Sequence, residues 1–312
     1  MKKFIIKVLL FVVLVLFAIM VVSLEIVLPT STRSSFSYLF AGKQKDFLLE
    51  TTKSPRIIFV GGSNLAYGLD SQMIKDSIGL NPVNTGLTAN LGLKYMLDNT
   101  YQYIKEGDIV IVAAEYEHFY RDYDYGSKEL LVTFLKVDKS KIRLMSIRQI
   151  KNSLLYYTIL ITTRLRDTIF PRVEEEKLIY GLNRFNEYGD HYTHWDLDVR
   201  DFLPYKEPYI NDYNPKVIEK LKEFEERIRL KGAVLYVSYP SMQDISFDNY
   251  IEVINKIEDE FIRHGFTLLG TPGRYRMDTS LMFDSPYHPN GTGVVLRTEL
   301  LIEDLREAGV GN

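Results

Sequence analysis

The stretch 56–70, RIIFVGGSNLAYGLD, carries the strongest fold signal in this chain of 312 residues. Residues 57–60 form an unbroken apolar run, which is typical of a strand buried on both faces of a parallel sheet. The run ends at two glycines, and apolar residues then recur at helical spacing from Leu65 onward. The Ser63 hydroxyl is therefore expected at the carboxyl end of a buried strand, where open α/β sheets bind their ligands.

The same junction has a plainer interpretation, an ordinary strand-to-helix turn with Ser63 as a helix cap. Three other kinds of site are excluded. Leu65 replaces the second glycine of a G-x-S-x-G nucleophile elbow. No Lys-Ser/Thr pair follows to complete a phosphate loop, and the chain has no G-x-G-x-x-G for a dinucleotide.

Charge and composition narrow the functional classes. The net charge is −3 and the basic residues are spread along the chain, which argues against a nucleic-acid partner. The chain has no cysteine, so a disulfide framework and a thiolate metal site are both excluded. The lack of cysteine is compatible with an oxidising compartment.

The amino terminus predicts a membrane anchor. Three lysines precede an apolar run over 8–24, and with its flanks this run is long enough to cross a bilayer at about 1.5 Å per residue. The lysines are expected to stay in the cytoplasm, which places the rest of the chain outside. A cleaved signal peptide is the alternative, but residues 21–25, VVSLE, offer no A-x-A-like site. We predict a retained single-pass transmembrane segment over 1–28, with the C-terminal domain extracytoplasmic.

The rest of the chain alternates strands and helices, which indicates a doubly wound parallel sheet. We expect a juxtamembrane linker with a short packed segment over 29–54 and one α/β domain over 55–312. Between 115 and 212 the alternation stops, and we interpret that stretch as a helical or irregular insertion covering the carboxyl edge of the sheet. The expected strands are 57–60, 83–85, 108–114, 233–238 and 266–269; the expected helices are 71–77, 154–165, 173–180, 250–264 and 290–308, with two more between Thr88 and Gly107 and between Asn214 and Gly232.

A second polar loop is expected at the same edge as Ser63. Residues 284–291, DSPYHPNG, lie between the last expected strand and the closing helix. A serine hydroxyl needs a base to take its proton, and the base needs an acid to fix its tautomer. Ser63, His288 and Asp284 are the right residue types in the right places. Taken alone, His288 also fits a surface histidine near a helix start.

Three stretches taken in this order, 59–71 (FVGGSNLAYGLDS), 84–92 (NTGLTANLG) and 283–293 (FDSPYHPNGTG), resemble the SGNH (GDSL-like) hydrolases. The similarity is greatest to the extracytoplasmic branch that includes DltD-like and alginate-acetylation proteins, and it covers the first and last thirds of the chain. It implies a three-layer α/β/α, flavodoxin-like parallel sheet. It also implies that Ser63 is the nucleophile, that Gly86 is an oxyanion-hole donor through its N–H, and that His288 is the base.

Two departures from the family pattern stand out. The family has Asp-x-x-His, whereas here Ser285 holds the acid position and Asp284 lies one residue earlier. Pro286 biases Ser285 toward extended geometry, so we predict that the loop folds the Asp284 carboxylate back onto His288.

The second departure concerns the oxyanion hole. The family's Gly-x-Asn-Asp block is missing, and loss of one donor costs about 3 kcal/mol of transition-state stabilisation. The oxyanion is then left to the N–H groups of Ser63 and Gly86, with Asn64 or Asn90 as a further candidate donor.

Other polar clusters are weaker candidates. Glu115, Glu117 and His118 resemble a loose metal cluster, but their spacing fits no established pattern, and we expect a solvated strand end. His191-x-x-His194 invites the same comparison. Tyr192 and Trp195 beside it suit a loop whose aromatic faces stack on sugar rings, with packing as the alternative. We predict no metal site.

The function expected from these observations is a membrane-anchored extracytoplasmic serine esterase or O-acyltransferase. Its substrates would be esters of a cell-surface polysaccharide or a lipid-linked sugar, and an acyl-enzyme would form on Ser63 without a cofactor. Hydrolysis and transfer both remain open. The alternative is a non-catalytic accessory protein of the same fold that binds a glycan or a membrane O-acyltransferase.

Overall fold

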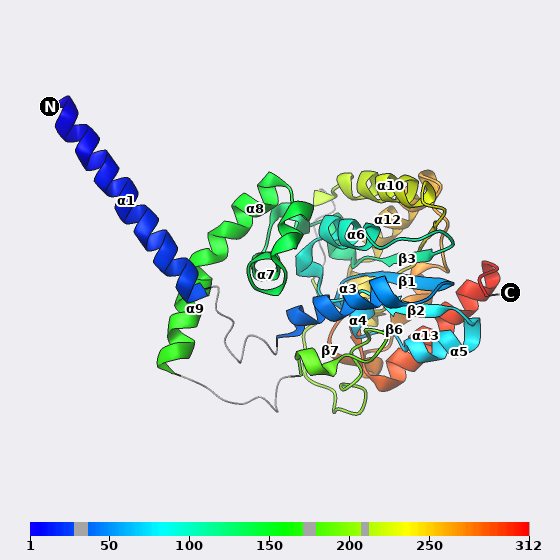
Figure 1. The fold of residues 1–312 in the computed structure, drawn as a ribbon. Helices are drawn as coiled ribbons and strands as arrows, with labels where there is room; N and C mark the ends of the chain where they lie inside the picture. Colours follow the sequence, from blue (N-terminus) through cyan, green and yellow to red (C-terminus); the bar gives the residue numbers. More distant parts are fainter. Residues whose placement is uncertain (28–36, 171–178, 207–211, 312) are drawn as a thin grey trace.

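A parallel four-stranded sheet forms the centre of the molecule. The computed structural model describes residues 1–27, 37–170, 179–206 and 212–311 (Figure 1). The sheet has the order β2-β1-β3-β4. Its strands are β1 (Arg56–Gly61), β2 (Asn81–Asn84), β3 (Ile109–Ala113) and β4 (Val234–Val237).

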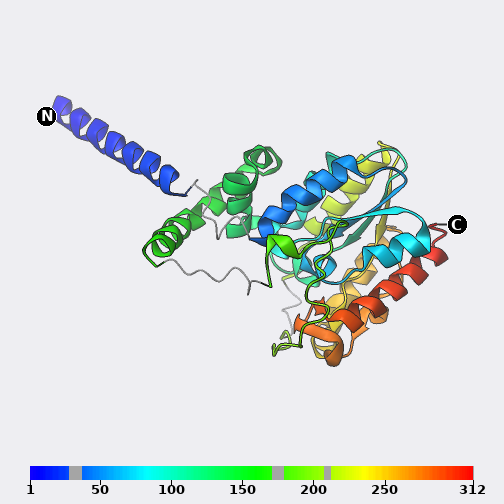
Figure 2. The ribbon, with the colours of Figure 1, turned by 60° about the horizontal axis from the view of Figure 1, so that its bottom comes forward.

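Helices cover both faces of this sheet, because alternate side chains of each strand point to opposite cores. Ile58 and Val60 of β1 belong to one core, whereas Ile57 and Phe59 belong to the other. Figures 1 and 2 show the resulting layers. The first core is completed by α3 (Ala41–Thr51), α6 (Leu93–Tyr101), α10 (Lys216–Arg229) and α12 (Ile251–Arg263), and the second by α5 (Ser71–Ile78) and α13 (Gly291–Glu307).

The expected strands and helices of the α/β domain are present with small shifts at their ends, apart from 266–269. Those residues form an isolated bridge between Leu268 and Val237 rather than a strand. Thr88 caps a short 3-10 turn, and α6 begins after Gly92. Two small sheets were not expected: β5 (Met242–Gln243) pairs with β6 (Arg276–Met277), and β7 (Met282–Ser285) pairs antiparallel with β8 (His288–Pro289). The remaining short helices are α4 (Ser63–Ala66) and α11 (Asp244–Asn249).

The linker predicted over 29–54 is wrong at its carboxyl end, because residues 37–54 belong to the folded domain. Ala41 and Leu49 of α3 are fully buried. Lys45 of α3 reaches the sheet, where its Nζ donates to the carbonyl oxygens of Asn84 (3.0 Å) and Gly189 (2.5 Å). Burial lowers the pKa of Lys45 to about 7. Sequence composition did not predict this helix, because it is buried on one side only and most of its residues are polar.

Helices and turns make up most of the insertion, as expected, and no strand of the central sheet lies in its described part. Residues 171–178, most of one expected helix, lie outside the described residues. The end of the insertion returns to the sheet, where Asn84 N–H donates to Tyr188 O (2.8 Å). The helices are α7 (Lys128–Val132), α8 (Ile147–Ser153) and α9 (Tyr157–Ile169), with a π turn at Thr133–Val137 and 3-10 turns at Tyr116–Phe119, Tyr123–Tyr125, Lys139–Leu144, Leu154–Tyr156 and Leu182–Arg184.

The amino-terminal segment is a helix, α1 (Lys2–Val27), which projects away from the rest of the molecule (Figure 1). Its described large apolar side chains are exposed. Over the side chains that the structure describes, which leave out positions 16, 20 and 23–27 of α1, no helix is long and apolar enough to cross a membrane. The membrane anchor over 1–28 therefore stays a prediction.

Candidate active site

The strand order creates one preferred place for a ligand. From β1 the chain adds β2 on one side and then crosses to add β3 on the other, so the order reverses between β1 and β3. Open α/β sheets bind ligands outside the carboxyl ends of the strands at such a point. Ser63 follows β1 and Glu115 follows β3, so both lie at this edge.

Ser63 is the first residue of α4, directly after Gly62. A side chain at position 62 has no room, because a Cβ there would lie 2.3 Å from Glu115 Oε1 and 2.7 Å from Ala89 N. Glycine therefore lets the chain turn close to the end of β3. The predicted place of Ser63, at the carboxyl end of a buried strand, is confirmed, and the residue is half-buried.

Asn64 holds this turn against β3 and α13 through hydrogen bonds. Its Nδ2 donates to Ala113 O (3.0 Å), and its backbone N–H donates to Glu115 Oε1 (3.1 Å). Its Oδ1 accepts a hydrogen bond from Arg297 of α13 (3.2 Å). Because Asn64 is fully buried and occupied in this way, it cannot reach a substrate, which corrects its expected place in the oxyanion hole.

Two buried charges of opposite sign flank Asn64. Burial alone would raise the pKa of Glu115, but His118 beside it and the Asn64 N–H hold that pKa below its usual value. Burial lowers the pKa of Arg297 to about 10. The expectation of a solvated strand end was wrong, because Glu115, Glu117 and His118 are all buried. The 3-10 turn over Tyr116–Phe119 directs them inward.

Gly86, which the resemblance implies as an oxyanion donor, lies against the turn that carries Ser63. A Cβ at this position would be 2.7 Å from Ala66 N and 2.7 Å from Leu65 Cβ. Its N–H, however, donates to Asn84 Oδ1 (2.9 Å) and is not free for a substrate. Ser63 N–H occupies the first position of a helix, where a backbone donor has no acceptor within the helix.

The structure joins the expected base and acid. His288 Nδ1 lies 2.8 Å from Asp284 Oδ1, although three residues separate them in sequence. The antiparallel pairing of β7 with β8, in which Ser285 is opposite His288, folds the carboxylate back. With Asp284 ionised, Nδ1 carries the shared proton, and Nε2 is left to accept another.

An additional tyrosine, Tyr180, orients Asp284. Its hydroxyl donates to Asp284 Oδ2, so each oxygen of this carboxylate accepts a hydrogen bond. Burial alone would raise the pKa of Asp284, but the bonds from His288 and Tyr180 hold it below its usual value. Burial and the bond to Asp284 raise the pKa of Tyr180. No sequence signal distinguishes Tyr180 from the other tyrosines of the insertion.

Tyr67 connects the serine turn to the base. Its N–H donates to Ser63 O (2.9 Å), which places it one helical turn after the serine. Its ring stacks on His288, with centroids 4.3 Å apart and planes at 16°, and also on His191, at 4.2 Å and 22°. Tyr67 is therefore bonded to Ser63 through its backbone and stacked on His288 through its ring. The described hydrogen bonds of His288 do not include Ser63 Oγ, and such bonds are often long in structures without substrate.

His191 and His194 form a buried pair rather than a metal site. Their Nδ1 atoms are 2.9 Å apart, and their Nε2 atoms face the carbonyl oxygens of Ile179 (2.8 Å) and Pro289 (3.0 Å). Burial lowers the pKa of His191 to about 4 and that of His194 to about 3. In the described part of the chain no group of three or more potential ligands could hold a metal ion.

The two aromatic residues expected to bind substrate lie beside the loop that carries His288. Trp195 packs against the start of α13, since a Cβ at Gly291 would be 2.5 Å from Trp195 O. The Tyr192 and Trp195 rings meet edge to face, with centroids 6.5 Å apart. Tyr192 is exposed and Trp195 is half-buried, so Tyr192 has the more accessible ring.

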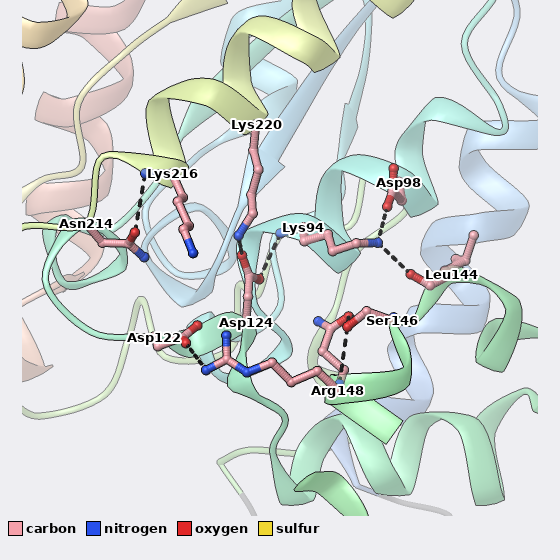
Figure 3. A network of polar contacts seen from close by, with 11 residues as sticks. Lys94, Asp98, Asp122, Asp124, Leu144, Ser146, Arg148, Asn214, Lys216 and Lys220 are labelled. Carbon is pink, nitrogen blue, oxygen red and sulfur yellow. Dashed lines mark hydrogen bonds and ion pairs between the residues drawn. The ribbon is translucent and has the colours of Figure 1, made fainter. Parts of the chain in front are cut away.

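A separate polar cavity of about 410 Å³ contains none of the expected site residues (Figure 3). Charges of opposite sign are already paired along its wall: Lys94 with Asp98 (2.6 Å), Arg148 with Asp122 (2.7 Å), and Lys220 with Asp124. This near-neutral lining gives no indication of a particular ligand.

No family model matches the chain, and no curated protein matches it significantly.

Proposed function

We propose that this chain is a serine esterase or O-acyltransferase with an SGNH-like α/β/α fold. The observation that carries the proposal is the hydrogen-bonded pair of Asp284 and His288, placed at the same sheet edge as the Ser63 turn and connected to it through Tyr67. A nucleophile, a base and an orienting acid are the three groups that a Ser-His-Asp triad uses for acyl transfer through serine.

The proposed reaction has two steps. His288 Nε2 takes the Ser63 proton as Oγ attacks an ester carbonyl, and the leaving alcohol then receives that proton as the acyl-enzyme forms. Water or a sugar hydroxyl then gives its proton to His288 as its oxygen attacks the acyl carbonyl. His288 passes that proton to Ser63 Oγ as the bond from Oγ to the acyl group breaks, which frees Ser63. Ser63 N–H supports the developing oxyanion in both steps. None of these steps uses a cofactor.

The proposed substrates are acyl esters of a cell-surface polysaccharide or of a lipid-linked sugar. The accessible ring of Tyr192 beside the catalytic loop supports this class, because aromatic faces stack on sugar rings. The proposal also places α1 in a membrane, with the catalytic domain outside the cytoplasm. Its support is the apolar run over 8–24 after three lysines and the exposure of its described side chains.

One observation favours a second candidate, a non-catalytic accessory protein that binds a glycan or a membrane O-acyltransferase. Gly86 N–H is occupied by Asn84, and a buried carboxylate, Glu115, stands where an asparagine donor is expected. An oxyanion hole with so few donors would give a slow enzyme.

The experiment that tests the proposal is an assay of the purified full chain on acetylated sugars, with and without an acceptor sugar. We expect released acetate, acetylated acceptor or both, and loss of both in Ser63→Ala. Ser285→Ala is the matched control and is expected to keep activity. Glycan binding without turnover, with binding unaltered in Ser63→Ala, would favour the accessory protein instead.

A further inference from the structure

Helix α9 presents an apolar surface to solvent. We define the α9 face by four exposed side chains, Leu155, Ile159, Ile169 and Phe170, which are 46% to 67% exposed. Leu155 lies in the 3-10 turn just before α9, and Phe170 follows its last residue. Ile159 and Ile169 lie on one side of α9, a side that also carries Thr162 and Arg166. Leu160 points the other way and is buried. Folding therefore buries Leu160 and leaves the four apolar side chains of the α9 face exposed in the described structure.

The position of α9 suggests what covers this face. Both ribbon views place α9 beside the carboxyl end of α1, on the side of the molecule from which α1 projects (Figures 1 and 2). The described large apolar side chains of α1 are also exposed. The exposed apolar side chains of α1 and those of the α9 face thus lie on the same side of the protein.

The charge of the segment agrees with a lipid surface. Residues 147–170 contain four basic side chains and one acidic side chain, Asp167. Helices that lie in a membrane interface combine an apolar face with basic residues, which attract anionic headgroups. On α13, by contrast, the exposed large apolar residues are Val295 and Leu296, at 42% and 36% exposure, and a few exposed apolar side chains are normal on a protein surface.

We propose that the α9 face lies in the headgroup region of the bilayer that holds α1. This second contact would restrain the domain at the membrane surface instead of leaving it on a free tether. It would bring the carboxyl edge of the sheet toward lipid-linked sugars in that membrane. The inference rests on the membrane location included in the proposed function, but not on catalysis by Ser63.

Because the chain has no cysteine, single-cysteine labelling tests the inference directly. The full chain carrying Ile159→Cys or Ile169→Cys is labelled with an environment-sensitive fluorophore and reconstituted into vesicles of phosphatidylethanolamine and phosphatidylglycerol. Leu14→Cys on α1 is the reference for the bilayer interior. Leu230→Cys, which replaces an 81% exposed side chain after α10, is the reference for water.

We expect nitroxide lipids to quench the labels at 159 and 169, and aqueous iodide to quench them several-fold less than the label at 230. If the label at 14 is protected while those at 159 and 169 are as open to iodide as the label at 230, α1 is membrane-embedded but the α9 face is not in the headgroup region. A label at 14 that iodide quenches as much as the label at 230 would contradict both the membrane location of α1 and the membrane contact of the α9 face. Protection of 159 and 169 in native membranes but not in vesicles would assign the face to a protein partner and overturn the lipid contact.

Discussion

His288 Nδ1 and Asp284 Oδ1 are joined by a hydrogen bond of 2.8 Å across three intervening residues. The bond depends on the β7–β8 pairing, which reverses the chain between the two side chains. It fixes the imidazole so that Nε2 is the nitrogen left to act as base. The geometry thus supplies an acid for His288 despite the unusual spacing.

Asp284→Asn is expected to lower kcat on the order of 10⁴-fold with little change in KM, because an amide favours the wrong imidazole tautomer. Steady-state kinetics on a soluble ester measures this. Asp278→Asn is the matched control, since the exposed Asp278 carboxylate only caps a 3-10 turn. An Asp284→Asn variant within tenfold of wild type, with Asp278→Asn or Glu115→Gln inactive, would contradict the assignment.

The Tyr67 ring and its hydroxyl have separable effects. The hydroxyl is buried and has no hydrogen-bond partner among the described residues. Tyr67→Phe keeps the stacked ring and removes an unsatisfied group, so we expect unchanged kcat and a gain of up to about 1 kcal/mol in stability. Tyr67→Ala leaves a cavity, so we expect it to lower the folding stability by about 3–5 kcal/mol and to abolish most of the activity. Equal losses in the two variants would show that the hydroxyl, not the stack, is required.

Tyr180 is expected to act as a positioning residue through Asp284. Without its hydroxyl the carboxylate keeps more charge to stabilise the imidazolium, so in Tyr180→Phe the acid limb of the kcat/KM profile should move to higher pH. We expect at most a tenfold loss of kcat. Tyr125→Phe, at an exposed tyrosine in another part of the chain, is the control. If the acid limb of the kcat/KM profile stays at the same pH while Tm falls, Tyr180 contributes only packing.

The sequence predicted the sheet well because its signals are local. Residues 57–60 are apolar throughout because both faces of β1 are covered. The sequence patterns did not predict helix α3, because its burial depends on contacts with the distant sheet. They also predicted that Glu115 would be exposed to solvent, whereas it is buried. Nothing near Glu115 in sequence indicates its contact with Asn64, 51 residues away. Local patterns therefore located Ser63, His288 and Asp284, but not the residues that hold them.

Glu117, which bonds to the loop that carries His288, is expected to make the stability of the fold depend on pH. Tyr287 donates to its carboxylate at 2.6 Å, and burial raises the pKa of Glu117 from 4.5 to about 7. Between these values the folded chain keeps a proton that the unfolded chain has lost, so stability falls as pH rises through this window and is level above it.

Glu117→Gln keeps an acceptor for Tyr287 and removes the charge. Its gain in stability over wild type should be small near pH 4.5 and grow to at most about 3 kcal/mol above pH 7. Thermal unfolding across this range measures the difference. Glu252→Gln, which removes a carboxylate at an exposed position on α12, is the control for the loss of a charge. A gain for Glu117→Gln that does not change with pH would contradict the buried, protonated carboxyl.

Covalent labelling of the purified chain by a fluorophosphonate tests the central claim most directly, because the probe reacts only with a serine that a base has activated. We predict one modified residue, Ser63, identified by peptide mass. We also predict that labelling is lost in Ser63→Ala, is strongly slowed in Asp284→Asn and continues in Ser285→Ala. An unlabelled folded protein, or one labelled as well in Ser63→Ala as in wild type, would contradict the assignment of Ser63 as the nucleophile.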